Sequence, residues 1–128
     1  MATQQAYGGG QFPNTARISN SQTGDGASTH TVDRGAAVER PALLTITTTV
    51  GATPTCTYAI EGSADGVDWF PVSYADAATP ETPAVATFDI TTETTARKIL
   101  RTGQPWRFLR LTYSANTNVT NTADVAIF

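Results

Sequence analysis

Apolar residues and threonines alternate with a period of two in several stretches of this chain. The alternation is clear over residues 43–50 and recurs over residues 55–60, 106–113 and 119–128. A period of two is typical of strands with one face in a protein core, because successive side chains of a strand point to opposite sides. Each of these four stretches is therefore predicted to be a β-strand.

Turn signals separate the predicted strands and add further ones. Residues 67–74 and 86–90 also fit strands, and Pro71 places the first of these at a sheet edge or a bulge, because proline cannot donate a ladder hydrogen bond. Residues 92–101 fit either a strand or a single helical turn. The predicted breaks, which are rich in glycine, proline and aspartate, are residues 51–54, 63–66, 75–83 and 103–105.

These elements predict an all-β fold, either a β-sandwich or a jelly roll of about six to eight strands. The 128 residues suffice for one domain with a core of its own. We expect that domain to span residues 29–128. Residues 1–28 are polar and contain three consecutive glycines, which predicts a flexible N-terminal arm. Arg17 and Ile18 form its only apolar patch, so the arm is either an unstructured terminus or a segment that orders against another surface.

The two faces of the predicted strand over residues 106–113 have different compositions. One carries Leu109, Leu111 and Tyr113, which we expect in the core. The other carries Trp106, Phe108 and Arg110, whose residue types are common both in cores and at the centres of interfaces. These three residues, with Arg17 and Ile18, are the candidate interface.

Two further side chains are predicted to lie in the core. Trp69 follows the Asp65–Gly66 turn at the start of a strand, and Cys56 alternates with threonines inside one. A buried cysteine behaves as a small apolar side chain. Because Cys56 is the only cysteine, the fold is expected not to depend on an internal disulfide.

No residue set predicts an enzyme or a bound cofactor. A catalytic triad would have to use His30, the only histidine, which is expected to face solvent before the first clear strand. Zinc sites normally need three or four histidine, cysteine or carboxylate ligands, so zinc is not expected. Glu61, Asp65 and Asp68 surround Gly66 and could hold calcium, but a β-turn with a solvated Asp65 is the preferred interpretation. No metal, cofactor or catalytic residue is therefore predicted.

Charge and hydropathy restrict the partners. The formal net charge of -3 does not favour nucleic-acid binding, although five of the eight cations fall between Arg97 and Arg110. No stretch approaches the ~20 apolar residues of a membrane-spanning helix. The first residues do not resemble a secretion signal, so we expect synthesis in a cytosol-like compartment.

Two segments together resemble known proteins. Residues 61–69 read EGSADGVDW, a strand and turn followed by a tryptophan, and residues 106–113 read WRFLRLTY, an aromatic and basic strand. The pair is similar to one in discoidin-type and galactose-binding-like jelly rolls. It is also similar to small virion proteins of tailed bacteriophages, including capsid decoration (cement) proteins. The single cysteine, the short chain and the polar arm favour the phage group.

The resemblance implies a non-enzymatic protein of the capsid exterior, made in the host cytoplasm. Its implied partners are the major capsid protein and further copies of itself, as a homodimer or homotrimer. Two alternatives stay open. One is a structural module of a phage tail, neck or fibre, and the other is a jelly roll that binds a glycan through an exposed aromatic side chain.

Overall fold

The computed structural model describes residues 2–5, 14–35, 38, 40–100 and 104–128. It confirms the all-β prediction, and no α-helix occurs in the described residues. Within the same residues, no helix is long and apolar enough to cross a lipid bilayer. The strands are β1 (Ala2–Gln5), β2 (Asn14–Gln22), β3 (Gly26–Ala27), β4 (His30–Asp33), β5 (Ala42–Ser63), β6 (Phe70–Pro71), β7 (Tyr74–Asp76), β8 (Phe88–Asp89), β9 (Thr94–Leu100) and β10 (Phe108–Ile127).

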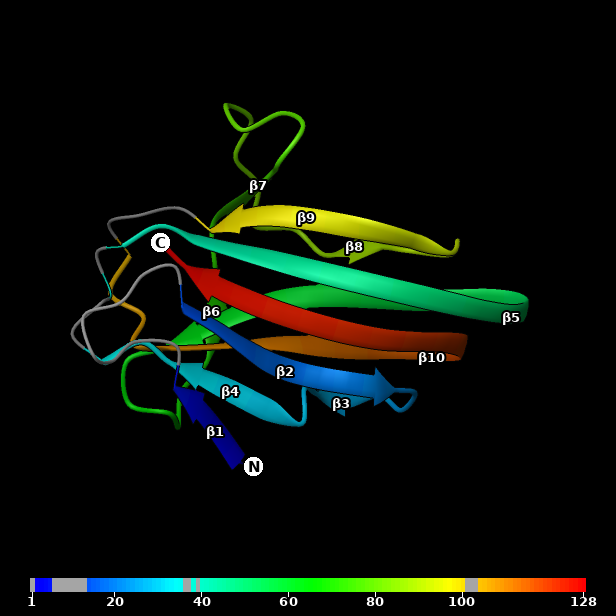
Figure 1. Ribbon diagram of the computed structural model, residues 1–128, viewed down its shortest axis with the longest axis horizontal. Helices are drawn as coiled ribbons and strands as arrows, with labels where there is room; N and C mark the ends of the chain where they lie inside the picture. Colours follow the sequence, from blue (N-terminus) through cyan, green and yellow to red (C-terminus); the bar gives the residue numbers. More distant parts are fainter. Residues whose placement is uncertain (1, 6–13, 36–37, 39, 101–103) are drawn as a thin grey trace.

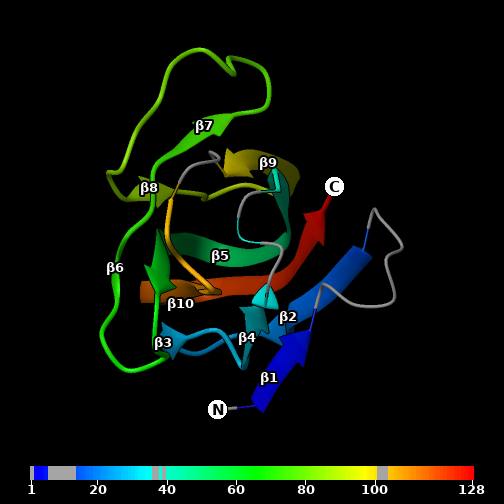
Figure 2. The same ribbon diagram turned by 90° about the vertical axis from the view of Figure 1, so that its left-hand side faces the viewer.

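Two long strands, β5 and β10, form the frame of the molecule. They pair antiparallel from Phe108–Ser63 at one end to Ile127–Ala42 at the other, and both fold back near the middle (Figure 1). Each therefore contributes one half to each of two layers, as the end-on view shows (Figure 2). The layers form a sandwich that is continuous through β5 and β10.

The shorter strands complete the two layers. In the first layer, β2 pairs with residues 121–127 of β10, and β9 pairs with residues 42–48 of β5. In the second layer, β3 and β4 pair with residues 108–113 of β10. There β6 and β8 lie along the second half of β5. The two remaining strands lie at the ends of the sheet, β7 beside β9 and β1 parallel to β4.

The bend in β5 lies at the predicted break over residues 51–54, and the bend in β10 lies between the predicted strands over residues 106–113 and 119–128. Thr53, Ala115 and Asn118 have φ angles of 50°, 51° and 57°. This left-handed conformation is uncommon for residues other than glycine. The register between the two strands shifts on both sides of Thr117. Between the Ser114–Thr57 and Val119–Val50 pairs, β5 has six residues (51–56) and β10 has four (115–118), so the pairing is irregular where the chain turns. The predicted strands over 43–50 and 55–60 are thus two halves of one bent strand.

The core lies between the layers and follows the predicted alternation. Leu109, Leu111 and Tyr113 are buried, as expected. Cys56 is also buried, and no cysteine pairing is present. Side-chain hydrogen bonds also join the layers: Tyr58 Oη donates to Asn121 Oδ1 at 2.6 Å, and Tyr113 Oη donates to Ser19 Oγ at 2.7 Å. Buried hydroxyls need such partners because burying an unpaired polar group is costly.

The predicted flexible arm over residues 1–28 differs from the structure. Its second half contains β2 and β3, which pair with β10, and residues 2–5 pair with β4. The side chain of Ile18 is only 1% exposed and belongs to the core. Burial of Ile18 and the pairing of β2 with β10, which has two register shifts, explain why this polar segment joins the sheet. The glycine-rich residues 6–13 lie outside the described residues.

The absence of a side chain at Gly62 leaves room for Trp106. A Cβ atom on Gly62 would lie 2.5 Å from Cγ of Trp106, closer than real contacts allow. Trp106 packs there against the edge of the core. We therefore expect Gly62→Ala to displace the indole and lower the free energy of unfolding by about 1–3 kcal/mol, the usual cost of overpacking. Urea denaturation would measure the change. A variant as stable as the parent would show that Trp106 can move without cost.

Candidate interaction surface

The segment between β5 and β6 carries the most exposed apolar side chains near the predicted interface. After β5 ends, residues 64–69 form a turn, and β6 returns along β5 with Phe70 opposite Gly62 and Pro71 opposite Glu61. This brings the segment next to the first residues of β10. Val67 is 75% exposed and Phe70 is 48% exposed. We call Val67, Phe70 and Trp106 the apolar rim.

Phe70 and Trp106 form a stacked pair within the apolar rim. Their ring centroids lie 5.5 Å apart with an interplanar angle of 19°. Trp106 is half-buried over Gly62, while Phe70 is largely open to solvent. Trp106 precedes β10 and packs on the side of the core, so the prediction that it shares a face with Phe108 and Arg110 is wrong. The strand pattern does not extend to Trp106 because Gly62 offers its ring a place inside.

Arg110 lies on the outer face of the second layer and contacts two side chains there. Its Nε donates to Glu61 Oε1 at 2.9 Å, and its guanidinium lies 4.1 Å from the ring centroid of Trp69. Thr112 Oγ1 donates to the same Glu61 oxygen at 2.6 Å. The group formed by Glu61, Trp69 and Arg110 is called the outer-face triplet below.

The prediction that Trp69 is buried in the core is wrong. Trp69 is only half-buried and does not belong to the core cluster. The register of β6 explains its position: Phe70 pairs with Gly62 on the inner side, so the neighbouring Trp69 lies on the outer side. Stacking against Arg110 then covers part of the indole, since a guanidinium is attracted to an aromatic face.

Phe108 is held among charged residues at the start of β10. The guanidinium of Arg107 lies 5.1 Å from its ring centroid. Arg107 also donates to both carboxylate oxygens of Asp33, at 2.7 and 2.9 Å. The hydrogen bonds from Arg107 hold the pKa of Asp33 below its usual range, against the effect of burial. Phe108 is therefore a half-buried support for the surface rather than an exposed anchor.

The turn before Trp69 is organised by Asp65, in agreement with the sequence. Asp65 Oδ1 accepts the backbone N–H groups of Val67 and Asp68 at 2.8 and 3.1 Å. These bonds to its charged form lower the pKa of Asp65. Gly66 has a φ angle of 81°, which a residue with a side chain rarely adopts. Across the described residues, no three histidine, cysteine or acidic side chains gather as a metal site.

Arg17 and Ile18, the other two predicted interface residues, lie on β2 in the other layer. Arg17 is exposed and donates to both carboxylate oxygens of Asp124, at 2.9 and 3.1 Å. Ile18 is in the core and is unavailable to a partner. The structure thus separates these residues from Phe108 and Arg110.

His30 and Lys98 occupy positions that the sequence did not indicate. His30 is half-buried in β4, which differs from the predicted solvent-facing position. Lys98 is almost fully buried and forms an ion pair with Asp76 from the neighbouring strand. Its Nζ also lies 4.4 Å from the ring centroid of Phe88. A buried lysine needs such partners because an isolated buried charge is costly.

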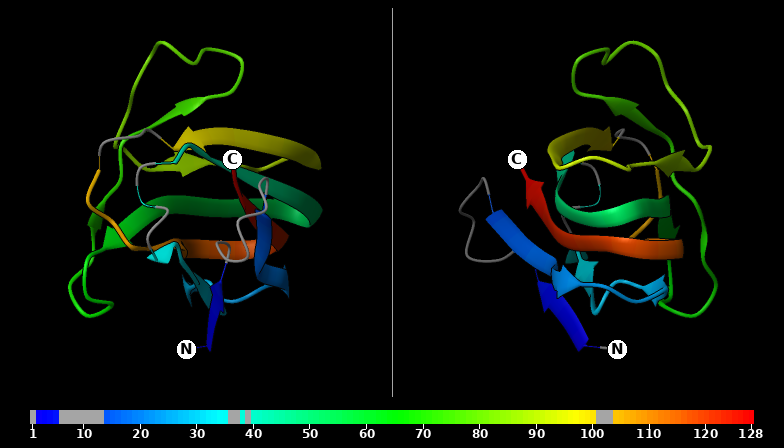
Figure 3. Two further views of the ribbon diagram at one scale, coloured as in Figure 1. Left: turned by 60° about the vertical axis from the view of Figure 1, so that its left-hand side comes forward. Right: turned by 90° about the vertical axis from the view of Figure 1, so that its right-hand side faces the viewer.

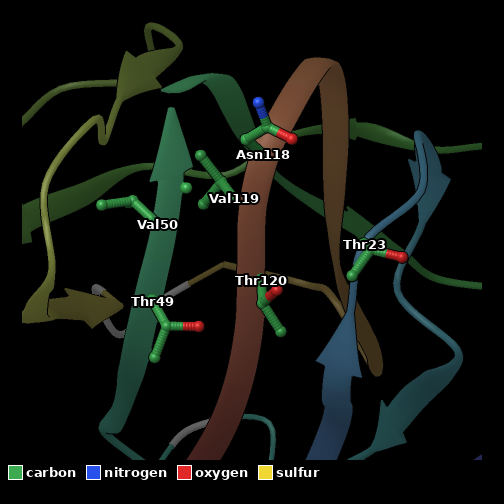
Figure 4. Close-up of a pocket in the computed structure, with 7 residues that line it drawn as sticks. Thr23, Thr49, Val50, Asn118, Val119 and Thr120 are labelled. Atoms are coloured by element: carbon green, nitrogen blue, oxygen red, sulfur yellow. The ribbon is translucent and has the colours of Figure 1, made fainter. Parts of the chain in front are cut away.

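A shallow hollow of about 450 Å³ lies beside the bends of β5 and β10. Figure 4 shows threonines from β5, β10 and the β2–β3 turn around it, together with Asn118. The hollow contains hydroxyl groups but no ionisable side chain, so it offers no group for acid–base chemistry.

Comparison with known proteins identifies a solved structure with the same fold. No protein-family model matches the chain, and no curated protein matches it. Among solved structures, the chain resembles the crystal structure of SPBc2 prophage-derived protein YomS, with a TM-score of 0.60. The two have the same fold. The match covers 92% of this chain and 96% of YomS, at 8% sequence identity. It therefore supports the overall architecture, and it carries no residue roles from YomS.

Proposed function

We propose that this chain is a non-enzymatic structural protein of a phage virion that docks on the outside of the capsid shell and stabilises it. The observation that carries the proposal is the apolar rim, where Phe70 exposes apolar surface beside Trp106 and Val67 is exposed three residues earlier in the chain. Exposed apolar side chains around a stacked aromatic pair are typical of interfaces. The likeness to a prophage-derived protein supports a phage origin.

A decoration protein needs a rigid scaffold more than it needs chemistry. Here two strands run through both layers, and β6 holds Phe70 of the rim against β5, while Val67 lies in the turn that leads into β6. A protein that binds only the assembled shell stabilises that shell by mass action. Many copies, each making modest contacts, then add their effects. In this proposal the major capsid protein is the partner, and a homodimer or homotrimer would bind across neighbouring capsid subunits.

Binding to undecorated shells is expected to depend on the rim. Purified protein would be mixed with expanded shells assembled from the capsid protein of the same phage, then sedimented and imaged. Phe70→Ser should weaken binding about tenfold or more, since removing a central aromatic anchor often costs 2 kcal/mol or more. Added ordered density and a higher melting temperature of the shells would support the proposal.

The matched control is Val85→Ser. Val85 is 59% exposed on the loop between β7 and β8, which projects away from both layers (Figure 3). The Val85→Ser variant removes an exposed apolar side chain, as the Phe70→Ser variant does. Because Val85 does not belong to the apolar rim, shell binding should be unchanged. If the parent protein binds purified tails or fibres and ignores the shells, the capsid assignment is wrong and the tail or fibre alternative stands.

A further inference from the structure

The outer-face triplet has hydrogen-bonding groups that the protein itself does not use. In Arg110, only Nε donates to a protein atom, which leaves both terminal amino groups of the guanidinium without a partner among the described residues. Glu61 accepts two hydrogen bonds, both through Oε1, so its Oε2 has no donor among the described residues. The indole N–H of Trp69 also has no acceptor in the described part of the chain.

These unused groups reach the solvent. Among the described residues, the only buried side-chain nitrogen or oxygen without a hydrogen bond is Nδ1 of His30. The amino groups of Arg110, Oε2 of Glu61 and the indole N–H are therefore open to a ligand, although the side chains of Arg110 and Glu61 are only 21% and 24% exposed. Groups that are mostly buried yet accessible at their polar ends are well positioned, because little side-chain entropy is left to lose.

The triplet is held in place from both sides. The carboxylate of Glu61 is fixed by Arg110 and by the hydroxyl of Thr112, and the guanidinium is fixed between Glu61 and the indole. Glu61 and Arg110 are direct neighbours across β5 and β10, and Pro71 of β6 lies opposite Glu61 on its other side. The acceptor and the guanidinium thus project from the adjacent strands β5 and β10, and the aromatic ring projects from the residue just before β6.

We propose that the outer-face triplet binds a pyranose sugar. A pyranose presents vicinal hydroxyls, each of which both donates and accepts, and its C–H groups form an apolar face. Adjacent hydroxyls can donate to Oε2 of Glu61 and accept from the free amino groups of Arg110. The exposed part of Trp69 provides an apolar contact and a further donor. Recognition through one aromatic contact and a few fixed polar groups is typical of small-ligand sites.

A second arginine–carboxylate pair, in the first layer, lacks the features of the proposed sugar site. Arg17 and Asp124 also form an exposed arginine–carboxylate pair, but there Arg17 uses both Nε and Nη2 on the two carboxylate oxygens. No aromatic contact to that pair occurs among the described residues. It lacks both the free acceptor and the apolar surface, and it serves as a control within the same molecule.

The test is a titration of the full chain with methyl glycosides of glucose, galactose, mannose and N-acetylglucosamine. The two tryptophans each give one indole N–H signal in a ¹⁵N NMR spectrum, and Trp69→Phe assigns them. At least one glycoside should shift the Trp69 signal in a saturable way and leave the Trp106 signal in place. Absence of any saturable shift with all four sugars, up to their solubility limits, overturns the proposal.

Conservative variants distinguish recognition from a structural effect. Glu61→Gln and Arg110→Lys should each weaken binding about tenfold, because each changes the hydrogen bonds that the site can offer. Asp124→Asn should bind like the parent. Equal weakening of sugar binding by Asp124→Asn would contradict the site. A saturable shift of the Trp69 signal with N-acetylglutamine amide, a peptide-like compound, and none with the sugars would also contradict it and would indicate a protein partner. The titration uses isolated protein, so its outcome is independent of shell binding.

Discussion

Replacing Tyr58 by alanine is expected to lower the free energy of unfolding by about 3–5 kcal/mol, the usual range for emptying a large aromatic site in a core. Tyr58 is fully buried. Its ring stacks on Phe88 at 5.2 Å and meets the edge of Tyr113 at 5.5 Å between centroids. Its hydroxyl also joins the two layers through Asn121. Urea denaturation followed by tryptophan fluorescence would measure the loss.

Two companion variants separate the contributions of Tyr58. Tyr58→Phe keeps the ring and leaves Oδ1 of Asn121 without its donor, so we expect a loss of about 1–3 kcal/mol. Thr47→Ala, on the exposed face of β5, should change stability by less than about 0.5 kcal/mol. A loss for Tyr58→Ala no larger than that for Thr47→Ala would show that the layers are not packed around this ring.

Stability should also fall steeply at alkaline pH. Burial raises the pKa of both Tyr58 and Tyr113 above the value of about 10 that they have in the unfolded chain. Above pH 10 the unfolded chain therefore loses these protons while the folded protein keeps them. Proton linkage then lowers the free energy of unfolding as pH rises, by up to about 1.4 kcal/mol per pH unit for each tyrosine. Below pH 10 the two hydroxyls give no pH dependence.

The alkaline effect can be assigned by comparing variants. Melting temperatures would be recorded between pH 8 and pH 12 for the parent and for a double variant with Tyr58→Phe and Tyr113→Phe. The double variant lacks both hydroxyls, so its profile should be flatter above pH 10, whatever its stability at neutral pH. Parallel profiles for the two proteins would show that other groups, such as Tyr74, cause the alkaline loss.

The core was predictable where alternation is strict and both partner strands are long. Leu109, Leu111 and Tyr113 were expected inside and are buried there. The predicted break at residues 51–54 marks a real change of direction, and so does the stretch at residues 114–118, which separates two predicted strands. Sequence could not show that the chain stays hydrogen-bonded through them, because a bend and a break have the same local composition. Only the partner strand decides which of the two occurs.

The candidate surface was predictable in part. Phe108 and Arg110 are on the outer face, as the alternation requires, but their contacts come from segments far away in the sequence. The exposure of Trp69 depends on the pairing of Phe70 with Gly62, and the burial of Ile18 depends on the pairing of β2 with β10. Local patterns do not contain these pairings. Pro71 was the one local sign that the segment carrying Trp69 lies at an edge.

The sharing of β5 and β10 between both layers has a consequence for how the protein folds during synthesis. Residues 119–127 of β10 lie in the middle of the first layer, between β2 and the first half of β5. On a ribosome these residues emerge after the other nine strands of the described residues, so β2 and β5 have no strand to join them until then. The nascent chain is therefore expected to hold unpaired edges until β10 has been synthesised, a state that favours aggregation and makes chaperone binding useful.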